Sequence, residues 1–299
     1  MITGEEKLTK FIPIQYHNRR YPDGISPEIH EVAGHFDVES LDSDSPFSLH
    51  TEYSFAARKL TSQLLEDFPI ISSGHKNSIP QLWLNDDWAY EFAGFINTLI
   101  DNEDNFKIVE VHPPFNDYCD SFSEFAGRYK VFENEVLSLY PEVDILIENR
   151  FGSQYRGGKF ILASTEDFQD LAETIESSGL KLRIILDVPQ LFTRYFGPRP
   201  KTAHKIKGIF NQLKDCREYI GGLHLWGKRR NAGGRWISHS GNLDTYFDND
   251  QKTKNVFLEG LFNLLDDGKT RYFVPEVNSS DEDLGLIVND LRKVGFKFI

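Results

Sequence analysis

Short apolar runs alternate with longer amphipathic segments from residue 107 to the carboxyl end of the chain. The runs have the continuous hydrophobicity of strands buried on both faces, whereas the amphipathic segments repeat apolar residues at the three and four spacing of a helix. Ser164 or Thr165 can cap one such helix, and Gly179 stands where that helix should end. The pattern predicts five strand and helix pairs, with strands at 107–113, 144–148, 182–187, 221–226 and 272–277 and helices at 121–140, 164–179, 203–219, 255–268 and 279–295.

The first third of the chain is less regular, but its apolar runs can supply three more strands. We expect these strands at 11–17, 36–41 and 47–53, with helices at 26–34 and 86–101. Strands that alternate with helices indicate a parallel sheet, and eight of them in 299 residues favour a closed barrel. We therefore predict an α/β fold, a single (β/α)8 TIM-barrel domain over residues 1–299. No glycine fingerprint for a dinucleotide and no GxxxxGK[ST] motif occurs in the sequence.

Potential metal ligands stand at the ends of four predicted strands, namely Glu148, Asp187, His224 and Glu276. The carboxyl ends of barrel strands are the positions from which TIM-barrel enzymes present reacting groups. This mixture of carboxylate and imidazole suits a divalent ion such as Zn, Mn, Mg or Co. His50 and His112 also end strand-like runs, so the pattern predicts one or two ions per chain. For any one residue, a polar group hydrogen-bonded to a loop is the alternative interpretation.

A segment rich in Gly, Asn, Asp and Ser, residues 226–250, is too long for an ordinary turn of a barrel and is therefore a candidate binding loop. His239 is a candidate metal ligand or substrate contact there. Arg229, Arg230 and Arg235 could neutralise a phosphate or a polyol alkoxide, or form an exposed basic surface. Trp226 is a pocket wall or a core residue, and Gln190, three residues after Asp187, is a candidate hydrogen-bonding contact.

The composition of the chain indicates which binding partners and which cellular compartment to expect. The formal net charge is −13 and the isoelectric point is near 5.2, which disfavours nucleic acid as a partner without excluding a local basic groove. Two cysteines in unrelated contexts support neither a disulfide framework nor a thiolate cluster. The amino terminus lacks the basic and apolar regions of a signal peptide, and no apolar run is long enough to cross a bilayer. We expect a cytoplasmic protein with no membrane partner, and the sequence leaves its oligomeric state open.

The strand-end segments resemble the xylose isomerase-like TIM-barrel superfamily, which includes sugar isomerases and epimerases together with endonuclease IV-type apurinic endonucleases. The matching segments are SLHTEYS at His50, VEVHPP at His112, ILIENR at Glu148, IILDVPQ at Asp187, GGLHLWG at His224 and FVPEVN at Glu276. Resemblance to the epimerases implies one metal on Glu148, Asp187, His224 and Glu276, with both glutamates as the acid and base and Arg230 at the substrate. Resemblance to the nucleases implies a second ion on His50, His112 and a bridging Glu148.

The chain departs from both patterns at one position and from the nuclease pattern at a second. Gln190 stands where both groups usually have a histidine. Ile237 replaces the aspartate of the nuclease Asp-x-His pair, of which only His239 is retained. These departures argue against a third metal ion.

The leading hypothesis from the sequence is a divalent-metal-dependent isomerase or epimerase that acts on a sugar, a sugar phosphate or a related polyol. Glu148 and Glu276 would transfer the proton beside the substrate carbonyl. The alternative hypothesis is a two-metal phosphoester hydrolase of the endonuclease IV type, with ions about 3.5–4 Å apart. A third possibility is a barrel without catalytic activity that keeps a metal to order a binding pocket.

Overall fold

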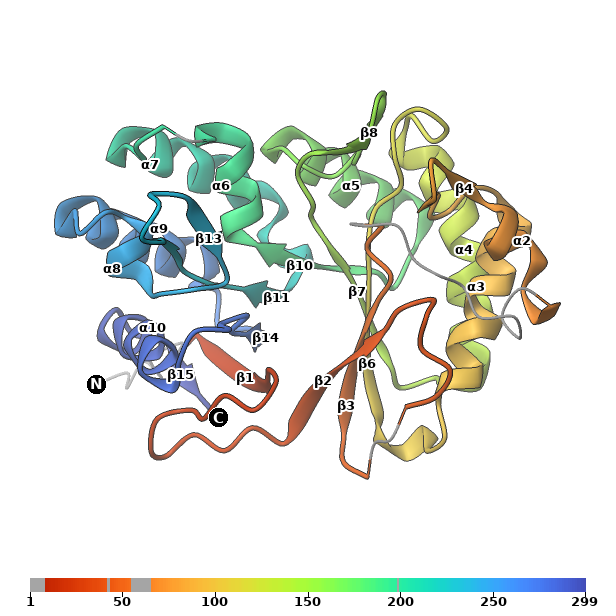
Figure 1. Ribbon diagram of the computed structural model, residues 1–299, viewed down its shortest axis with the longest axis horizontal. Coiled ribbons are helices and arrows are strands. Elements are labelled where there is room, and N and C mark those ends of the chain that lie inside the picture. Colours follow the sequence, from red (N-terminus) through yellow and green to blue (C-terminus); the bar gives the residue numbers. More distant parts are fainter. Residues whose placement is uncertain (1–8, 42–43, 55–65, 198) are drawn as a thin grey trace, which may run out of the picture. The chain divides into compact units, whose positions relative to one another are not determined.

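The computed structural model describes residues 9–41, 44–54, 66–197 and 199–299, and in this part of the chain nine strands form one sheet. The strand order is β14-β11-β10-β7-β6-β3-β2-β1-β15, and β14 also pairs with β1. Eight parallel strands therefore close into a barrel, and the predicted (β/α)8 fold is confirmed (Figure 1). The first eight residues, on which the signal-peptide prediction depends, lie outside the described residues.

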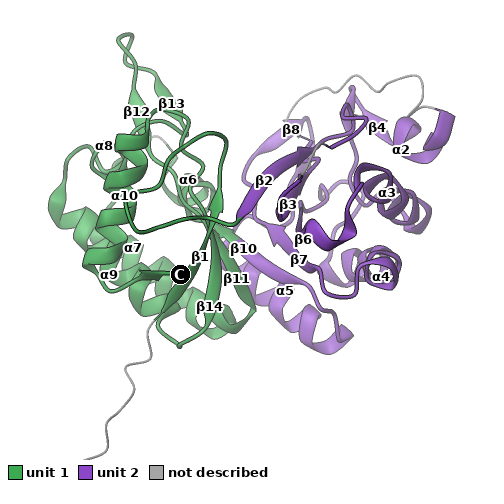
Figure 2. Cartoon of the chain, turned by 90° about the horizontal axis from the view of Figure 1, so that it is seen from below, with its two compact units in different colours: residues 1–28, 186–299 green, residues 29–185 purple. Residues whose placement is uncertain are grey.

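The chain forms two compact units, one from residues 29–185 and the other from residues 1–28 and 186–299 (Figure 2). The prediction of a single domain remains a prediction, and each unit is described here by itself. No helix in the described part is both long enough and apolar enough to span a bilayer.

The 29–185 unit contains four complete barrel strands and the first residues of a fifth. They are β2 (Ile29–Gly34), β3 (Phe47–Thr51), β6 (Phe106–Val111), β7 (Asp144–Glu148) and β10 (Arg183–Asp187). Its helices are α2 (Pro69–Ser73), α3 (Asp86–Leu99), α4 (Phe122–Leu139) and α5 (Thr165–Ser178), and the short pairs β4 (His75–Lys76) with β5 (Ile79–Pro80) and β8 (Ser153–Tyr155) with β9 (Gly158–Lys159) lie in its loops.

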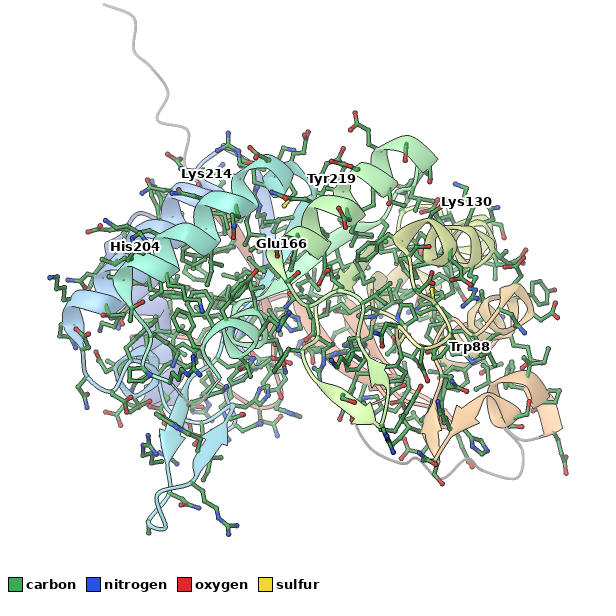
Figure 3. All side chains as sticks on the ribbon, turned by 90° about the horizontal axis from the view of Figure 1, so that it is seen from above. Trp88, Lys130, Glu166, His204, Lys214 and Tyr219 are labelled. Atoms are coloured by element: carbon green, nitrogen blue, oxygen red, sulfur yellow. The ribbon has the colours of Figure 1, made fainter. Side chains whose placement is uncertain are left out.

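Aromatic packing fastens α3 to α4 in this unit. Trp83 is fully buried, and its ring contacts those of Phe92 and Phe132 at centroid distances of 5.6 and 5.2 Å. Trp88 belongs to the same cluster, with its ring centroid 5.6 Å from that of Trp83, whereas Lys130 on α4 is partly exposed (Figure 3). Large aromatic side chains bury much apolar area each, so this cluster holds the two helices against the strands.

The 186–299 unit, with residues up to 28, contains β1 (Lys10–Gln15), β11 (Ile220–His224), β14 (Thr270–Val274) and β15 (Lys297–Phe298). Its helices are α6 (Val188–Phe196), α7 (Ala203–Gln212), α8 (Leu243–Tyr246), α9 (Gln251–Leu265) and α10 (Asp281–Lys293), and the hairpin of β12 (Lys228–Arg230) and β13 (Trp236–Ser238) projects from it (Figure 2). The predicted loop 226–250 thus holds this hairpin and α8.

Local sequence signals placed most helix ends correctly. The Ser164 hydroxyl accepts from the Asp167 amide, and the Asp167 carboxylate accepts from the Ser164 amide in return, which starts α5. Gly179 ends it with φ of 59°, a backbone conformation that glycine adopts without steric cost. The predicted helix 203–219 is shorter than expected, because α7 ends at Gln212 and a 3-10 helix follows over Leu213–Tyr219.

Two predictions in the first third were wrong. The segment 26–34 was expected to be helical, but Ile29–Gly34 is strand β2, which pairs in parallel with β3. The segment 36–41 was expected to be a strand, but it is a turn and loop that buries Phe36 and Leu41. Pairing with β3 overrides local preference at β2, and β-branched Ile29 and Val32 suit a strand. A side chain at Gly34 would collide with Leu49, since its Cβ would lie 2.6 Å from Leu49 Cδ1.

A buried arginine joins three chain segments of the 186–299 unit. Arg271 donates to the main-chain carbonyls of Arg217, Ile220 and Leu265, and its guanidinium pairs with both oxygens of Asp267 at 2.9 and 2.7 Å. Its side chain is fully buried. Losing it would leave the Asp267 carboxylate and these carbonyls without their charged partner.

We therefore expect Arg271→Met to lower the free energy of unfolding by about 3–5 kcal/mol, as for other broken buried ion pairs. Urea denaturation followed by circular dichroism measures this change. Exposed Lys269→Met is the matched control and should change stability by less than about 0.5 kcal/mol. Equal effects of the two substitutions would contradict a structural role for the Arg271 network.

Candidate functional site

The six predicted ligands all lie at or near the carboxyl ends of barrel strands. His50 is the penultimate residue of β3, His112 follows β6 and Glu148 ends β7, all in the 29–185 unit. In the other unit, Asp187 and His224 end β10 and β11, and Glu276 stands two residues after β14. All six residues are buried, with exposed fractions between 0% and 9%.

His50, His112 and Glu148 converge on one point within the 29–185 unit. Glu148 Oε2 lies 2.8 Å from His112 Nε2 and 3.3 Å from His50 Nε2, and the two imidazole nitrogens are 3.2 Å apart. The two rings stack with centroids 5.0 Å apart. Register explains the meeting, since β3, β6 and β7 are neighbours and His50 lies opposite Glu110, two residues before His112.

A further carboxylate orients the first imidazole. His50 Nδ1 lies 3.0 Å from Glu31 Oε1, so Nε2 faces His112 and Glu148. Burial lowers the pKa of His50, but the carboxylates of Glu31 and Glu148 outweigh burial and raise that pKa well above its ordinary value. Without a metal ion, His50 is therefore cationic between two acids.

His112 and Glu148 have the protonation states that ligands require. Burial lowers the pKa of His112 to about 4, although Glu148 acts in the opposite direction, so this imidazole is neutral at physiological pH. Burial raises the pKa of Glu148, but the charge of Arg150 and the hydrogen bonds with His112 and His50 together hold it well below its usual range. Arg150 Nη1 lies 3.2 Å from Glu148 Oε1.

The three ligand atoms fit a divalent ion of the zinc type. A tetrahedral ion with bonds of about 2.0–2.1 Å places its ligand atoms roughly 3.3 Å apart, close to the 2.8–3.3 Å seen among these three atoms. The donors are two imidazoles and a carboxylate, a common zinc set, and a carboxylate behind a ligating histidine is the usual support of such a site. The donor chemistry and spacing therefore suit a metal.

A second carboxylate lies deeper, beside the same histidine. Glu31, His50 and Glu110 each present one possible ligand atom within 4.8 Å of the others. Glu110 is fully buried and accepts a hydrogen bond of 2.6 Å from Ser48. Since Glu110 also raises the pKa of His50, it adds to the negative field that favours a cation at this end of the strands.

Asp187 has three structural roles in the other unit. It ends β10, and its Oδ1 accepts from the Gln190 amide at 2.7 Å, which caps α6. Its Oδ2 accepts from Trp226 Nε1 at 3.1 Å. Trp226 is 2% exposed, so its indole is a buried partner of Asp187 with little surface for substrate. Gln190 is half-buried at the third residue of α6.

His224, Glu276 and His239 form the remaining cluster of this unit. Glu276 Oε1 lies 3.5 Å from His224 Nδ1, and Glu276 Oε2 lies 3.6 Å from His239 Nδ1. The His239 ring stacks on Trp226 with centroids 4.1 Å apart and interplanar angle 23°. His239 has φ of 54°, an uncommon value for a residue with a Cβ, and the strained turn directs the imidazole to Glu276.

Arg230 is exposed on β12, and its side chain contacts other residues of the same hairpin. Its guanidinium lies 4.2 Å from the Trp236 ring centroid and donates to the carbonyl of Gly234 at 3.1 Å. Its predicted contact with substrate stays a prediction. Arg229 is also exposed, on the opposite face of the hairpin from Arg230.

Sequence reasoning missed Glu31, Arg150 and Tyr53. Glu31 was hidden because β2 was taken for a helix, so its position at a strand beside His50 did not emerge. Arg150 follows Glu148 by two residues, and that spacing was visible in the ILIENR segment. Its guanidinium lies 5.0 Å from the ring centroid of Tyr53, which in turn lies 5.8 Å from the His112 ring. These side chains form an aromatic and cationic border around the three ligands.

Comparison with known proteins yields structural neighbours but no family. No protein-family profile and no curated protein matches the sequence, so the xylose isomerase-like resemblance remains a prediction. Solved structures that align include an endoglucanase (13% identity, TM-score 0.37, 80% of this chain and 66% of that one), an aldolase called QR15 (10%, 0.36, 98% of each chain) and the GH53 catalytic domain from Ignisphaera aggregans (9%, 0.40, 84% and 74%). The chain thus spans just under two thirds of that endoglucanase. Likenesses this distant carry no information on the activity of this chain.

Proposed function

We propose that the chain is a divalent-metal-dependent hydrolase that cleaves a phosphoester of a small, carbohydrate-like substrate. The observation that carries this proposal is the convergence of His50 Nε2, His112 Nε2 and Glu148 Oε2 within 3.3 Å in one unit. The proton-transfer scheme favoured by the sequence has no role for the two histidines. The two-metal scheme requires both, and this geometry is our reason for preferring it to the proton-transfer scheme.

The metal would be held by His50, His112 and Glu148 in the 29–185 unit. When bound, such an ion supplies Lewis acidity and lowers the pKa of a water ligand toward neutrality. Asp187, His224 and Glu276 remain the predicted ligands of a further ion, with Glu148 as the predicted bridge. The proposal therefore allows one ion per chain, or two if the further ion also binds.

The protein groups around this site suit a phosphate ester. Arg150 brings a fixed positive charge beside Glu148, and guanidinium groups pair well with phosphate oxygens. Tyr53 offers an aromatic face at the same border, which can pack against the carbon skeleton of a sugar-like group. Glu31 holds the His50 ring in place by its bond to Nδ1. The net charge of −13 disfavours a long nucleic acid as the substrate.

A second candidate, the isomerase or epimerase, is favoured by the surroundings of Glu276. This carboxylate is 5% exposed and lies between His224 and His239, whose imidazoles can relay a proton to or from it. In that scheme Glu148 and Glu276 transfer the proton at carbon, and His239 with Arg230 contacts the substrate. The two candidates differ in the bond broken: a phosphorus–oxygen bond in the first and a carbon–hydrogen bond in the second.

The first test concerns the metal. Glu31→Gln should weaken zinc binding about 10–100-fold, because removal of the carboxylate behind a ligating histidine has that effect in known sites. Competition with a chromophoric chelator measures the affinity. The exposed Glu39→Gln is the matched control and should bind zinc as the unsubstituted chain does. Unchanged affinity in Glu31→Gln would show that this histidine does not hold the metal.

The second test concerns hydrolysis. His112→Ala should lower turnover of p-nitrophenyl phosphate or bis(p-nitrophenyl) phosphate by about 100–1,000-fold, because metal assistance contributes several kcal/mol to such a barrier. Excess chelator should lower the turnover of the unsubstituted protein to the same extent, and added zinc or manganese should restore that turnover. His204→Ala is the control, since His204 is exposed on the outer side of α7 (Figure 3). Full activity in His112→Ala would refute the proposed site.

The third test separates the two candidate reactions. An isomerase or epimerase working in deuterated water incorporates deuterium at carbon, which nuclear magnetic resonance of a panel of aldoses, ketoses and their phosphates detects. We expect no incorporation at carbon and release of inorganic phosphate from the phosphorylated members. Deuterium incorporation that disappears in Glu276→Gln would instead establish the isomerase.

A further inference from the structure

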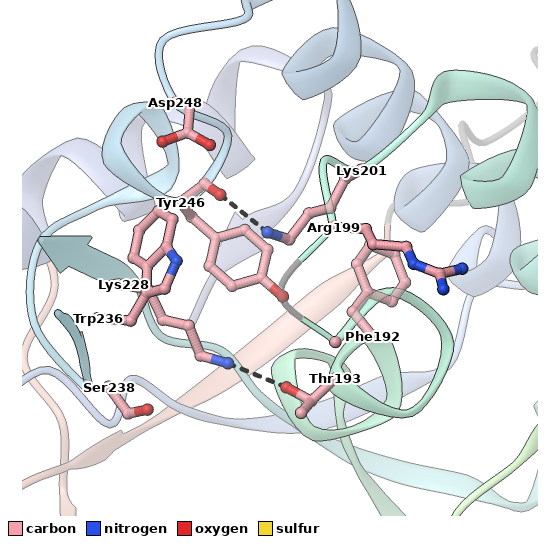
Figure 4. Close-up of a pocket in the computed structure, with 10 residues that line it drawn as sticks. Phe192, Thr193, Arg199, Lys201, Lys228, Trp236, Ser238, Tyr246 and Asp248 are labelled. Atoms are coloured by element: carbon pink, nitrogen blue, oxygen red, sulfur yellow. Dashed lines mark hydrogen bonds between the residues drawn. The ribbon is translucent and has the colours of Figure 1, made fainter. Parts of the chain in front are cut away.

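A separate cavity of about 230 Å³ lies wholly within the 186–299 unit, between α6, the segment that leads into α7, and the β12–β13 hairpin (Figure 4). Whole small-molecule sites usually measure about 300–1,000 Å³. A cavity of this size therefore accommodates one compact group of a ligand, such as a phosphate with a few attached carbons.

The charged residues that line this cavity are mostly cationic. Lys201, Lys228 and Arg199 contribute three positive charges, and Asp248 contributes one negative charge. This balance is opposite in sign to the whole chain, whose net charge is −13. A local excess of positive charge in a concave site raises the concentration of anions there.

The two lysines are half-buried and make only neutral contacts. Lys228 Nζ donates to Thr193 Oγ1 at 2.9 Å, and Lys201 Nζ donates to the Tyr246 carbonyl at 3.1 Å (Figure 4). Among the described residues, no carboxylate lies within ion-pair distance of either ammonium group. Burial and then the nearby charge of Lys228 lower the pKa of Lys201 to about 8, against a smaller opposing effect of Asp248. Burial also lowers the pKa of Lys228, against an opposing effect of the Asp187 charge. The cavity thus keeps two ammonium groups that have no ion-pair partner among the described residues.

The hairpin supplies further donors and a flat wall. Lys228 pairs with Ser238 across the hairpin and Arg230 pairs with Trp236, so these four side chains share one face. Trp236 and Ser238 line the cavity. A hydroxyl and an indole face beside two ammonium groups suit an oxyanion that carries a short carbon skeleton.

We propose that this cavity is a subsite for the phosphate monoester group of a small molecule, with Lys201 and Lys228 as its cationic contacts and Ser238 as a further donor. The inference goes beyond the proposed hydrolase, because the subsite needs no metal and lies entirely in the other unit from His50 and His112. It gives the loop 226–250 a binding role through Lys228, Trp236 and Ser238, whereas the sequence pointed to its arginines and His239.

Isothermal titration calorimetry at pH 7 in excess chelator tests the proposal with glycerol 3-phosphate, inorganic phosphate and glycerol as probes. We expect glycerol 3-phosphate to bind, inorganic phosphate to bind more weakly and glycerol not to bind. Lys201→Met and Lys228→Met should each weaken binding at least tenfold. Lys201→Arg and Lys228→Arg, which keep the charge, should retain most of it. Lys207→Met, an exposed substitution on α7, should change nothing.

Absence of binding, or binding that survives the double variant Lys201→Met with Lys228→Met, would overturn the subsite. Equal affinity for inorganic phosphate and glycerol 3-phosphate would overturn the ester and assign a free phosphate. The chelator separates these outcomes from the metal proposal, since a failure of zinc binding at His112 leaves this titration unaffected.

Discussion

The ionised state of one fully buried carboxylate underlies the candidate site. Glu148 sits at 0% exposure at the end of a strand, where an uncompensated charge would be very costly. His50, His112 and Arg150 compensate it, and two of these depend on a neighbour in turn: His50 on Glu31, and Arg150 on the face of Tyr53. The cluster is therefore a network in which the position of each group requires the others. A divalent cation would compensate the same buried charge, because it can bind several negative oxygens at once.

The barrel supplies this network through strand register. β3, β6 and β7 are adjacent and parallel, so their carboxyl ends bring a histidine, a histidine and a glutamate to one place. β2 adds Glu31 from the next position in the sheet. The ligands come from residues more than thirty positions apart, and the main-chain hydrogen bonds of β3, β6 and β7 hold each of them at or next to a strand end. Sites built on strands in this way hold their geometry better than sites built on loops.

The sequence predicted the barrel because its buried parallel strands have a clear pattern of consecutive apolar residues. The runs at 144–148 and 182–187 each contain three consecutive apolar residues followed by an acid, and the structure places β7 and β10 there. β2 was missed because its exposure alternates irregularly and a long-range partner, β3, decides its conformation. The same error hid Glu31. Pairwise contacts such as Trp226 with Asp187 follow from side-chain directions that no local pattern encodes. The predicted site residues were found from strand ends alone, so their positions emerged while their partners did not.

The β12–β13 hairpin has consequences for how substitutions could accumulate in this chain during evolution, because its side chains alternate between two faces. Lys228, Arg230, Trp236 and Ser238 share one face, and Arg229 and Ile237 occupy the other. The two faces share the same main chain but present different side chains. Neither face carries a candidate metal ligand. Substitutions at alternate positions can thus alter the lining of the adjoining cavity while the other face of the hairpin stays unchanged. In the proposed subsite, ligand preference therefore depends on a few partly exposed residues that can vary one at a time, whereas the mutually dependent acids and imidazoles of the strand ends have to vary in concert.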